Sequence, residues 1–358
     1  MKLIILIDDL LCGGTEFTLR ARLQHFPKGW KLKILVLYAK GTVGELIANM
    51  GFEIEFIDFK KLGYYKGIKK IRRITEDFKP DKLIFFRDVT RGLLPYFITF
   101  SNAEKFLFWD STVIYRSMKQ FLAEFFQVMF VNHKKICSSS AIARKLKKMY
   151  LCNQAYICYN CYDEKRFFFK DGKDFSFKEN RKIRILSVGN MRFEKNHIDK
   201  LKTALNLKES GVLFKMDIVG MGDFSSLKNL RDRYNLEEEV SFLGEIKCLE
   251  NIIHEYDFFF MTSFAEGCPV SLLESMASGL LCISYMYDGL ENIDPENKYI
   301  IKVDPATPEN ASTQFQAAIK GEINISQRSL ETASYTKQNF SSKNSALLWW
   351  KIFENEIN

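Results

Sequence analysis

The chain has 358 residues, of which 47% are hydrophobic and 27% are charged. This length is too great for one compact core and suits two domains. The balance of hydrophobic and charged residues is that of a globular protein and excludes extensive disorder.

The formal net charge of +8 is unevenly distributed along the chain. Residues 1–170 contain 30 Lys and Arg against 16 Asp and Glu, whereas residues 171–358 contain 22 against 28. The basic first half predicts an anionic partner. No nucleic-acid motif accompanies the charge, and a phosphorylated, lipid-linked glycan or an anionic membrane surface fits it as well.

The first residues indicate a buried strand rather than an export signal. Apolar residues 3–7 follow Met1 and Lys2, and Asp8 and Asp9 then end the run. No stretch reaches the roughly 18 uncharged apolar residues of a membrane span. We expect a cytoplasmic protein that can contact the inner face of the membrane peripherally. The eight cysteines lack a repeated spacing, which predicts free thiols and no metal site.

Short apolar runs alternate with amphipathic stretches through the first half, which predicts βαβ units and a mostly parallel sheet. The predicted strands are residues 3–7, 33–37, 53–57, 82–86, 105–109, 135–138 and 155–159. The predicted helices are residues 15–25, 44–50, 65–78 and 141–150.

A charged, turn-prone segment at residues 170–182 predicts a linker, after which the alternation restarts. The predicted strands are residues 183–188, 214–219, 240–243, 258–262 and 281–285. The predicted helices are residues 197–210, 223–234, 270–278 and, at the end of the chain, 343–356.

The first glycine motif is Gly13-Gly14-Thr15-Glu16, between the first predicted strand and its helix. Glycines let backbone amides approach a ligand, and a helix N-terminus favours anions. A plain tight turn remains the alternative for this motif alone.

The second predicted domain also opens with a glycine turn, Gly189-Asn190, followed by the cations Arg192 and Lys195. Cations can stabilise the charge that grows on a diphosphate leaving group. The chain contains no Asp-x-Asp pair, which is typical of metal-dependent sugar transferases. A solvated charged loop is the alternative. The glycines of Gly220-Met221-Gly222, after the next strand, are equally compatible with a simple turn.

The most informative segment runs from Glu266 through Gly267-Cys268-Pro269-Val270 to Glu274. Pro269 suits the first turn of a helix, so Glu266 is predicted in the loop before it and Glu274 in its second turn. Leu272, Leu273 and Met276 surround Glu274, and a half-buried carboxylate needs donors such as sugar hydroxyls. Exposed amides at the helix start can meet a phosphate.

Taken together, the motifs resemble family 4 of the retaining glycosyltransferases, whose signature is a Glu-x7-Glu pair. Their order and spacing match at Gly189 to Lys195, Gly220-Met221-Gly222, Phe242-Leu243-Gly244 and Glu266 to Glu274. The resemblance is strong over residues 183–285. It is thinner over residues 1–170, where Gly13-Gly14-x-Glu16 and Asn160-Cys161-Tyr162-Asp163 to Phe167 carry it.

The resemblance implies an α/β fold of the GT-B type, with two Rossmann-like, doubly wound parallel-sheet domains facing a cleft. We expect an acceptor-binding domain at residues 1–165 and a nucleotide-sugar-binding domain at residues 175–335. Residues 336–358 are expected to form a helix that crosses back to the first domain.

The resemblance also implies roles for individual residues. Glu266 would bind hydroxyls of the donor sugar, Glu274 the nucleotide ribose and Lys195 the diphosphate. The amides near Gly14 and Val270 would approach the phosphates and the sugar. The remaining donor-binding candidates are Gly13, Gly189, Asn190, Gly220, Gly222, Gly267, Cys268 and Pro269. Transfer would retain the anomeric configuration without a metal or other cofactor.

Two positions depart from the family pattern. Asn190 stands where the family usually has Arg, and Arg192 is the candidate to supply that cation. Phe108-Trp109-Asp110 stands where many members have a His that often contacts the donor sugar, and Asp110 is the candidate substitute. Residues 64–73 are basic with interleaved apolar residues, and residues 116–135 are rich in Phe. Each stretch is either a membrane contact or an ordinary helix face.

We therefore expect a glycosyltransferase that moves a sugar from a nucleotide diphosphate to a glycan or lipid-linked acceptor in cell-surface polysaccharide or lipopolysaccharide synthesis. The alternatives are a nucleotide-sugar-binding scaffold subunit with little catalytic activity, and another GT-B-type enzyme, such as a sugar-nucleotide epimerase or a phosphorylase.

Overall fold

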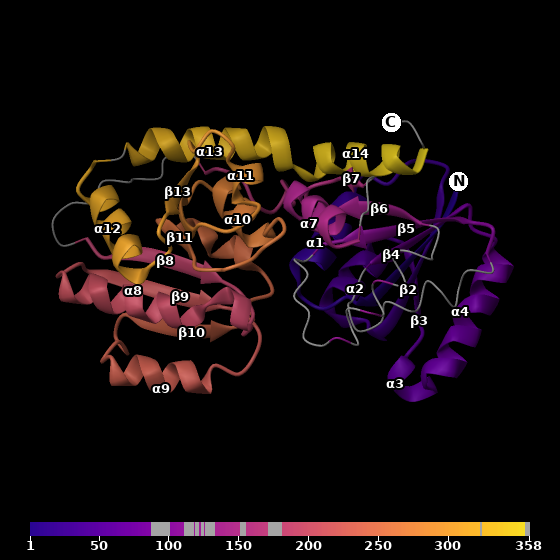
Figure 1. The fold of residues 1–358 in the computed structure, drawn as a ribbon, viewed down its shortest axis with the longest axis horizontal. Coiled ribbons are helices and arrows are strands. Elements are labelled where there is room, and N and C mark those ends of the chain that lie inside the picture. The colour runs from indigo at the N-terminus through magenta and orange to yellow at the C-terminus, as the bar shows by residue number, and fades with distance from the viewer. Residues whose placement is uncertain are drawn as a thin grey trace. The chain divides into compact units, whose positions relative to one another are not determined.

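The computed structural model describes residues 1–86, 101–110, 118, 122, 125, 133–150, 155–170, 181–322 and 324–354. The chain divides into two compact units (Figure 1). One unit consists of Met1–Cys161 together with Ser342–Asn358, and the other of Tyr162–Ser341. The expected linker at 170–182 and the Phe-rich stretch at 116–135 lie largely outside the described residues.

The first unit is built on a parallel sheet of seven strands in the order β3-β2-β1-β4-β5-β6-β7. Its central strand β1 is buried along residues 3–7, because helices cover both faces of the sheet. The strands are β1 (Lys2–Asp9), β2 (Lys31–Ala39), β3 (Glu53–Phe56), β4 (Lys82–Phe86), β5 (Glu104–Trp109), β6 (Lys134–Cys137) and β7 (Tyr156–Ile157).

One face of this sheet packs on α1, α2 and α14, and the other on α3, α4 and α7. The apolar side of α14 contributes Trp349, Trp350 and Phe353 to the core of this unit. The helices are α1 (Gly14–Leu23), α2 (Gly41–Asn49), α3 (Phe59–Leu62), α4 (Tyr64–Phe78), α7 (Ser140–Tyr150) and α14 (Ser342–Glu354).

The second unit has a six-stranded parallel sheet in the order β10-β9-β8-β11-β12-β13. The strands are β8 (Ile183–Val188), β9 (Phe214–Val219), β10 (Val240–Gly244), β11 (Phe258–Met261), β12 (Leu281–Tyr285) and β13 (Ile300–Val303). Both units are therefore Rossmann-like, as the sequence predicts.

Helices α8, α9 and α12 cover one face of the second sheet with a continuous apolar core, while α10 packs on β11, β12 and α13. The helices and single turns are η2 (Phe193–Lys195), α8 (His197–Glu209), α9 (Ser225–Arg233), η3 (Leu249–Asn251), η4 (Ile253–Glu255), α10 (Val270–Ala277), α11 (Leu290–Ile293), α12 (Pro308–Ile319) and α13 (Ile325–Phe340). No described helix has the length and hydrophobicity needed to cross a bilayer.

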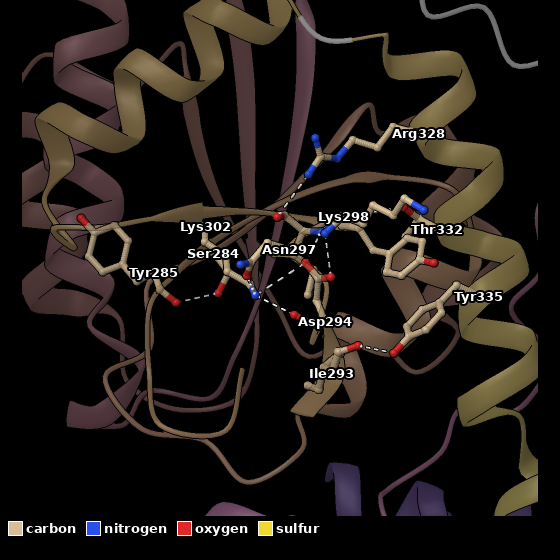
Figure 2. A network of polar contacts seen from close by, with 12 residues as sticks. Ser284, Tyr285, Ile293, Asp294, Asn297, Lys298, Lys302, Arg328, Thr332 and Tyr335 are labelled. Carbon is tan, nitrogen blue, oxygen red and sulfur yellow. Dashed lines mark hydrogen bonds and ion pairs between the residues drawn. The ribbon is translucent and has the colours of Figure 1, made fainter. Parts of the chain in front are cut away.

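The edge strand β13 was not predicted, and a buried carboxylate organises the chain that leads into it (Figure 2). Asp294 is fully buried and accepts hydrogen bonds from the backbone N–H groups of Lys298, at 2.8 Å, and Ile300, at 3.0 Å. The Lys302 ammonium lies 3.8 Å from the same carboxylate. These polar contacts order the segment that leads into β13, whose Ile301 and Val303 pack in the apolar core.

Candidate active site

The candidate site of the second unit lies where the strand order of its sheet reverses. β8 pairs with β9 on one side and with β11 on the other, so the loops that leave β8 and β11 are neighbours. Open α/β sheets bind ligands at this position, beyond the carboxyl ends of the strands. The loop after β8 carries Asn190, Arg192 and Lys195, and the loop after β11 carries Glu266.

Lys195 and Glu266 form an ion pair across this point, with 2.6 Å between Lys195 Nζ and Glu266 Oε1. Their side chains are 20% and 13% exposed, so the pair is accessible from the surface. The structure thus brings together a cation suited to a diphosphate and a carboxylate suited to sugar hydroxyls, which are 71 positions apart in the sequence.

Backbone contacts hold the two loops side by side. The N–H of Phe264 donates to the carbonyl of Glu194 over 2.9 Å. The hydroxyl of Thr262 lies 2.9 Å from the carbonyls of both Lys195 and Asn196. Because Asn196 has a left-handed backbone, η2 ends there and α8 begins. These contacts fix the position of Lys195 relative to Glu266.

Asn190 connects the loop after β8 to the loop after β9. Its side-chain oxygen accepts the N–H of Met221 at 2.9 Å, and the N–H of Met191 donates to the carbonyl of Met221 at 2.7 Å. A Cβ atom at Gly220 would lie 2.1 Å from the carbonyl oxygen of Gly189, so only glycine fits at this approach. Asn190, Gly189, Gly220 and Gly222 therefore lie together.

Arg192 is more exposed than Lys195 and makes a longer ion pair. Its side chain is 60% exposed, and its guanidinium lies 3.9 Å from the carboxylate of Glu194. It lies on the same loop as Lys195 but is held by no close contact to Glu266 or Glu274 among the described residues.

The N-terminus of α10 lies directly after the loop that carries Glu266. Pro269 is the N-cap residue, with an extended backbone, rather than part of the first turn as the sequence suggested. Cys268 and Val270 are buried beside it, and Gly267 completes the turn. The first amides of a helix lack intrahelical acceptors, which makes this end suited to an anion.

Glu274 occupies the second turn of α10, as predicted, and is 9% exposed. Burial raises the pKa of its carboxyl to about 8, which the nearby Arg166 opposes and Glu250 and Asp163 reinforce. Arg166 donates two hydrogen bonds to the carboxylate of Glu250, from Nε at 2.8 Å and from Nη2 at 2.7 Å, in a bidentate ion pair. Within the described ranges, no donor reaches the carboxylate of Glu274, which leaves it available to ligand hydroxyls.

Three buried polar residues near the site were missed by sequence reasoning. The Tyr287 hydroxyl is buried without a hydrogen-bond partner in the described part of the chain, and burial beside Glu266 raises its pKa. His197 and Lys200 lie behind the loop of Lys195. The signal for Lys200 was its place on the apolar stripe of α8, with Leu201, Ala204 and Leu207.

In the first unit, the candidate residues are Asp110, Gly13 and Gly14. The carboxylate of Asp110, directly after β5, is in contact with the Thr15 hydroxyl and accepts a hydrogen bond from Asn160 Nδ2 at 2.5 Å. A Cβ atom at Gly13 would lie 2.2 Å from a carboxylate oxygen of Glu16, so this acid already covers the start of α1 at Gly14. Asp110 thus has structural partners, and Glu16 would have to move before an anion met Gly13 or Gly14.

Residues 169–337 match the family model described as "Glycosyl transferases group 1". The putative glycosyltransferase EpsF of Bacillus subtilis is 39% identical over 90 residues, covering 25% of this chain and 23% of that protein. The putative colanic acid biosynthesis glycosyltransferase WcaL of Escherichia coli is 29% identical over 128 residues, 32% of this chain and 31% of that protein. The match thus spans less than a third of either relative.

Among solved structures, Anabaena HepE in complex with UDP-glucose has a TM-score of 0.84 and 13% identity, with 99% of this chain and all of that chain (100%) covered. This likeness shows the fold, which is of the GT-B type.

Proposed function

We propose that this protein is a glycosyltransferase of the retaining family 4 type, which moves a sugar from a nucleoside diphosphate to a glycan or lipid-linked acceptor. The observation that carries the proposal is the Lys195–Glu266 pair at the switch point of the second sheet. The match of residues 169–337 to group 1 glycosyltransferases supports it.

In this proposal the ammonium of Lys195 binds the diphosphate and stabilises the charge that develops as the sugar leaves. The carboxylate of Glu266 accepts hydrogen bonds from sugar hydroxyls, and that of Glu274 accepts the ribose hydroxyls. The first amides of α10, near Cys268 and Val270, meet the phosphates.

Retention requires the acceptor oxygen to bond to the anomeric carbon on the face from which the phosphate leaves. The bond between the anomeric carbon and the phosphate oxygen breaks, and the leaving diphosphate takes the proton of the acceptor hydroxyl. We propose that Lys195, Arg192 and the α10 amides stabilise this leaving group without a metal or other cofactor.

The donor and acceptor follow from the similar proteins and from charge. HepE was solved with UDP-glucose, which favours a UDP-sugar as the donor. WcaL is named for colanic acid biosynthesis, which favours a cell-surface polysaccharide or lipopolysaccharide precursor as the acceptor. The basic first half of the chain suits an anionic acceptor and peripheral contact with the inner face of the membrane.

A screen of the purified protein against UDP-, GDP-, ADP- and CMP-sugars, with and without EDTA, tests the proposal. We expect calorimetric binding of one nucleoside diphosphate sugar and slow release of its nucleotide, both unaffected by EDTA. Binding without turnover on any acceptor would favour a scaffold subunit. Binding of no donor would overturn the proposed function, and a strict metal requirement would overturn its mechanism.

A further inference from the structure

A buried lysine lies one layer behind the loop that carries Lys195. Lys200 occupies the first turn of α8 and is 2% exposed. Its Nζ atom lies 3.1 Å from Nδ1 of His197, which is 3% exposed. Within the described ranges, no carboxylate lies within ion-pair distance of Lys200. A buried ammonium without such a partner is costly, so its retention here calls for an explanation.

Hydrogen bonds connect Lys200 through His197 to the loop after β8, which carries Gly189 and Asn190. Nε2 of His197 lies 3.1 Å from the carbonyl oxygen of Asn190. A carbonyl only accepts, so this nitrogen carries the proton of the ring, and Nδ1 accepts from Lys200. Burial and the neighbouring Lys200 lower the pKa of His197 to about 3, which keeps the ring neutral.

The Asn190 carbonyl, at the end of this series of hydrogen bonds, is held in place within the loop. It also accepts the N–H of Arg192 at 2.8 Å, while the side chain of Asn190 holds the N–H of Met221. The two cations of the loop, Arg192 and Lys195, follow within five residues of Asn190. A change at Lys200 therefore reaches the Asn190 carbonyl through two hydrogen bonds and the backbone of Arg192 through a third.

We propose that Lys200 is a positioning residue for diphosphate binding, which acts through His197 on the Asn190 carbonyl and couples its own proton to the anion bound beside Lys195. This inference rests on the proposed function, because it assumes that the loop binds a nucleoside diphosphate.

The electrostatic surroundings support this coupling. Burial and then the charge of Lys195 on η2 together lower the pKa of Lys200 to about 7, and Glu266 before α10 opposes the shift. On its own helix Lys200 faces the neutral ring of His197. An anion beside Lys195 offsets the repulsion and raises the pKa of Lys200, so the protein takes up a proton near neutral pH when it binds the anion.

The test uses UDP as the probe and compares the wild type with Lys200→Met by titration calorimetry, in buffers of different ionisation heat. At about pH 6.5 we expect Lys200→Met to weaken UDP binding about tenfold, with a smaller difference at about pH 9 where the wild-type lysine is neutral. Near neutral pH the wild type should take up about half a proton more than the variant. The phosphate of UDP itself titrates near pH 6, so only the difference between the proteins is interpreted.

Lys202→Met is the matched control, because Lys202 lies on the same helix with a 49% exposed side chain and pairs with Asp199 at 3.6 Å. It should bind UDP like the wild type at every pH. If Lys200→Met does not fold, His197→Phe breaks the same series of hydrogen bonds and should by itself weaken UDP binding. Where both variants fold, their combination should cost less than the sum of the two losses.

The outcomes separate the two proposals. If the wild type binds UDP, and Lys200→Met or His197→Phe binds it equally well with the same proton uptake, the role of Lys200 is overturned and the proposed function stands. If the wild type binds none of UDP, GDP and ADP, both proposals fall together.

Discussion

In the proposed mechanism, the ion pair between Lys195 and Glu266 links the group that binds the diphosphate to the group that binds the sugar. Each side chain neutralises the other in the unliganded protein, at 2.6 Å. A nucleotide sugar would replace this contact with two others, one from the diphosphate to Lys195 and one from sugar hydroxyls to Glu266. The pair therefore holds both groups in place while preventing either charge from remaining unpaired.

Loss of either group should lower turnover far more than it affects folding. We expect Lys195→Met and Glu266→Gln each to reduce kcat by about 10²–10³-fold, because each removes an interaction with charge or hydroxyl groups at the reacting centre. Lys195→Met should also weaken diphosphate binding. Initial rates with the donor identified by screening measure this effect. Lys202→Met provides the control, and wild-type rates in both site variants would refute the assignment.

Glu274 provides a pH-dependent prediction about stability. Its pKa in the folded protein is about 8, above the value of about 4.3 for an unfolded chain. Folding therefore favours the protonated carboxyl. Its contribution is fully present below about pH 4.3, falls progressively as the pH rises and is lost once the pH passes about 8. We expect Glu274→Gln to stabilise the unliganded protein at about pH 8.5 by about 1–3 kcal/mol, and to have little effect at about pH 4.5.

Thermal unfolding across this pH range measures the difference between the wild type and Glu274→Gln. The same variant should bind UDP more weakly, because the amide cannot accept both ribose hydroxyls as a carboxylate does. A variant that was less stable than the wild type at high pH would show that Glu274 already has a donor in the folded protein.

The residues of the candidate site differ in how far sequence alone predicts them. Glu266 and Glu274 belong to a spaced motif, and the helix between them follows from Pro269 and the apolar run. The catalytic role of Asp110 stays a prediction, and its contacts to Thr15 and Asn160 depend on the pairing of distant strands, which sequence does not show. The buried positions of Lys200 and Tyr287 depend on tertiary packing, which the charge or hydroxyl of a side chain does not reveal.

At the scale of the elements, one buried cation adds polar contacts to the apolar packing of α14 in the first unit. Arg22 of α1 is fully buried, donates from Nε to the Ser345 hydroxyl at 3.1 Å and lies 4.3 Å above the ring of Trp349. Nη2 of the same guanidinium donates to the carbonyl of Tyr159 at 2.9 Å. A planar guanidinium makes these contacts together, which an ammonium cannot.

Arg22→Met should therefore destabilise the protein by about 2–4 kcal/mol, since it removes the hydrogen bonds and leaves the Tyr159 carbonyl without this donor. Arg22→Lys should restore only part of this loss. Unfolding in urea measures both variants. Lys351→Met, at an exposed position of α14, is the control and should remain within about 0.5 kcal/mol of the wild type. Equal stability of Arg22→Met and the control would refute the role of the cation.

The elements that sequence predicts well are those with a strong pattern. β8, β9 and β12 have the predicted bounds, because each is a short, mostly apolar segment between turn residues. β13, α12 and α13 were not predicted. β13 is only four residues long and depends on Asp294, and α13 is rich in Ser and Thr, so neither has the periodicity of a typical buried element.

At the scale of the whole molecule, the asymmetric charge predicts association with anionic surfaces. The exposed side of α4 carries Lys66 and Lys69, whose ammonium groups have no carboxylate partner within the described ranges, beside the 81% exposed Tyr65. Arg72 and Arg73 on the same helix are paired with Glu76 and Asp77. Free lysines beside an exposed aromatic ring suit a phosphate-rich surface.

The last prediction concerns this surface in the intact protein. We expect the wild type to bind vesicles that contain phosphatidylserine, and Lys66→Glu with Lys69→Glu to bind at least about tenfold more weakly, since each basic residue contributes about 1 kcal/mol. Binding should also fall as salt shortens the range of electrostatic attraction. Co-sedimentation measures both effects. Lys320→Glu with Lys337→Glu changes the net charge equally at exposed positions of the second unit. If this control lost as much binding, the attraction would arise from total charge rather than from α4, and salt-insensitive binding would exclude an electrostatic origin.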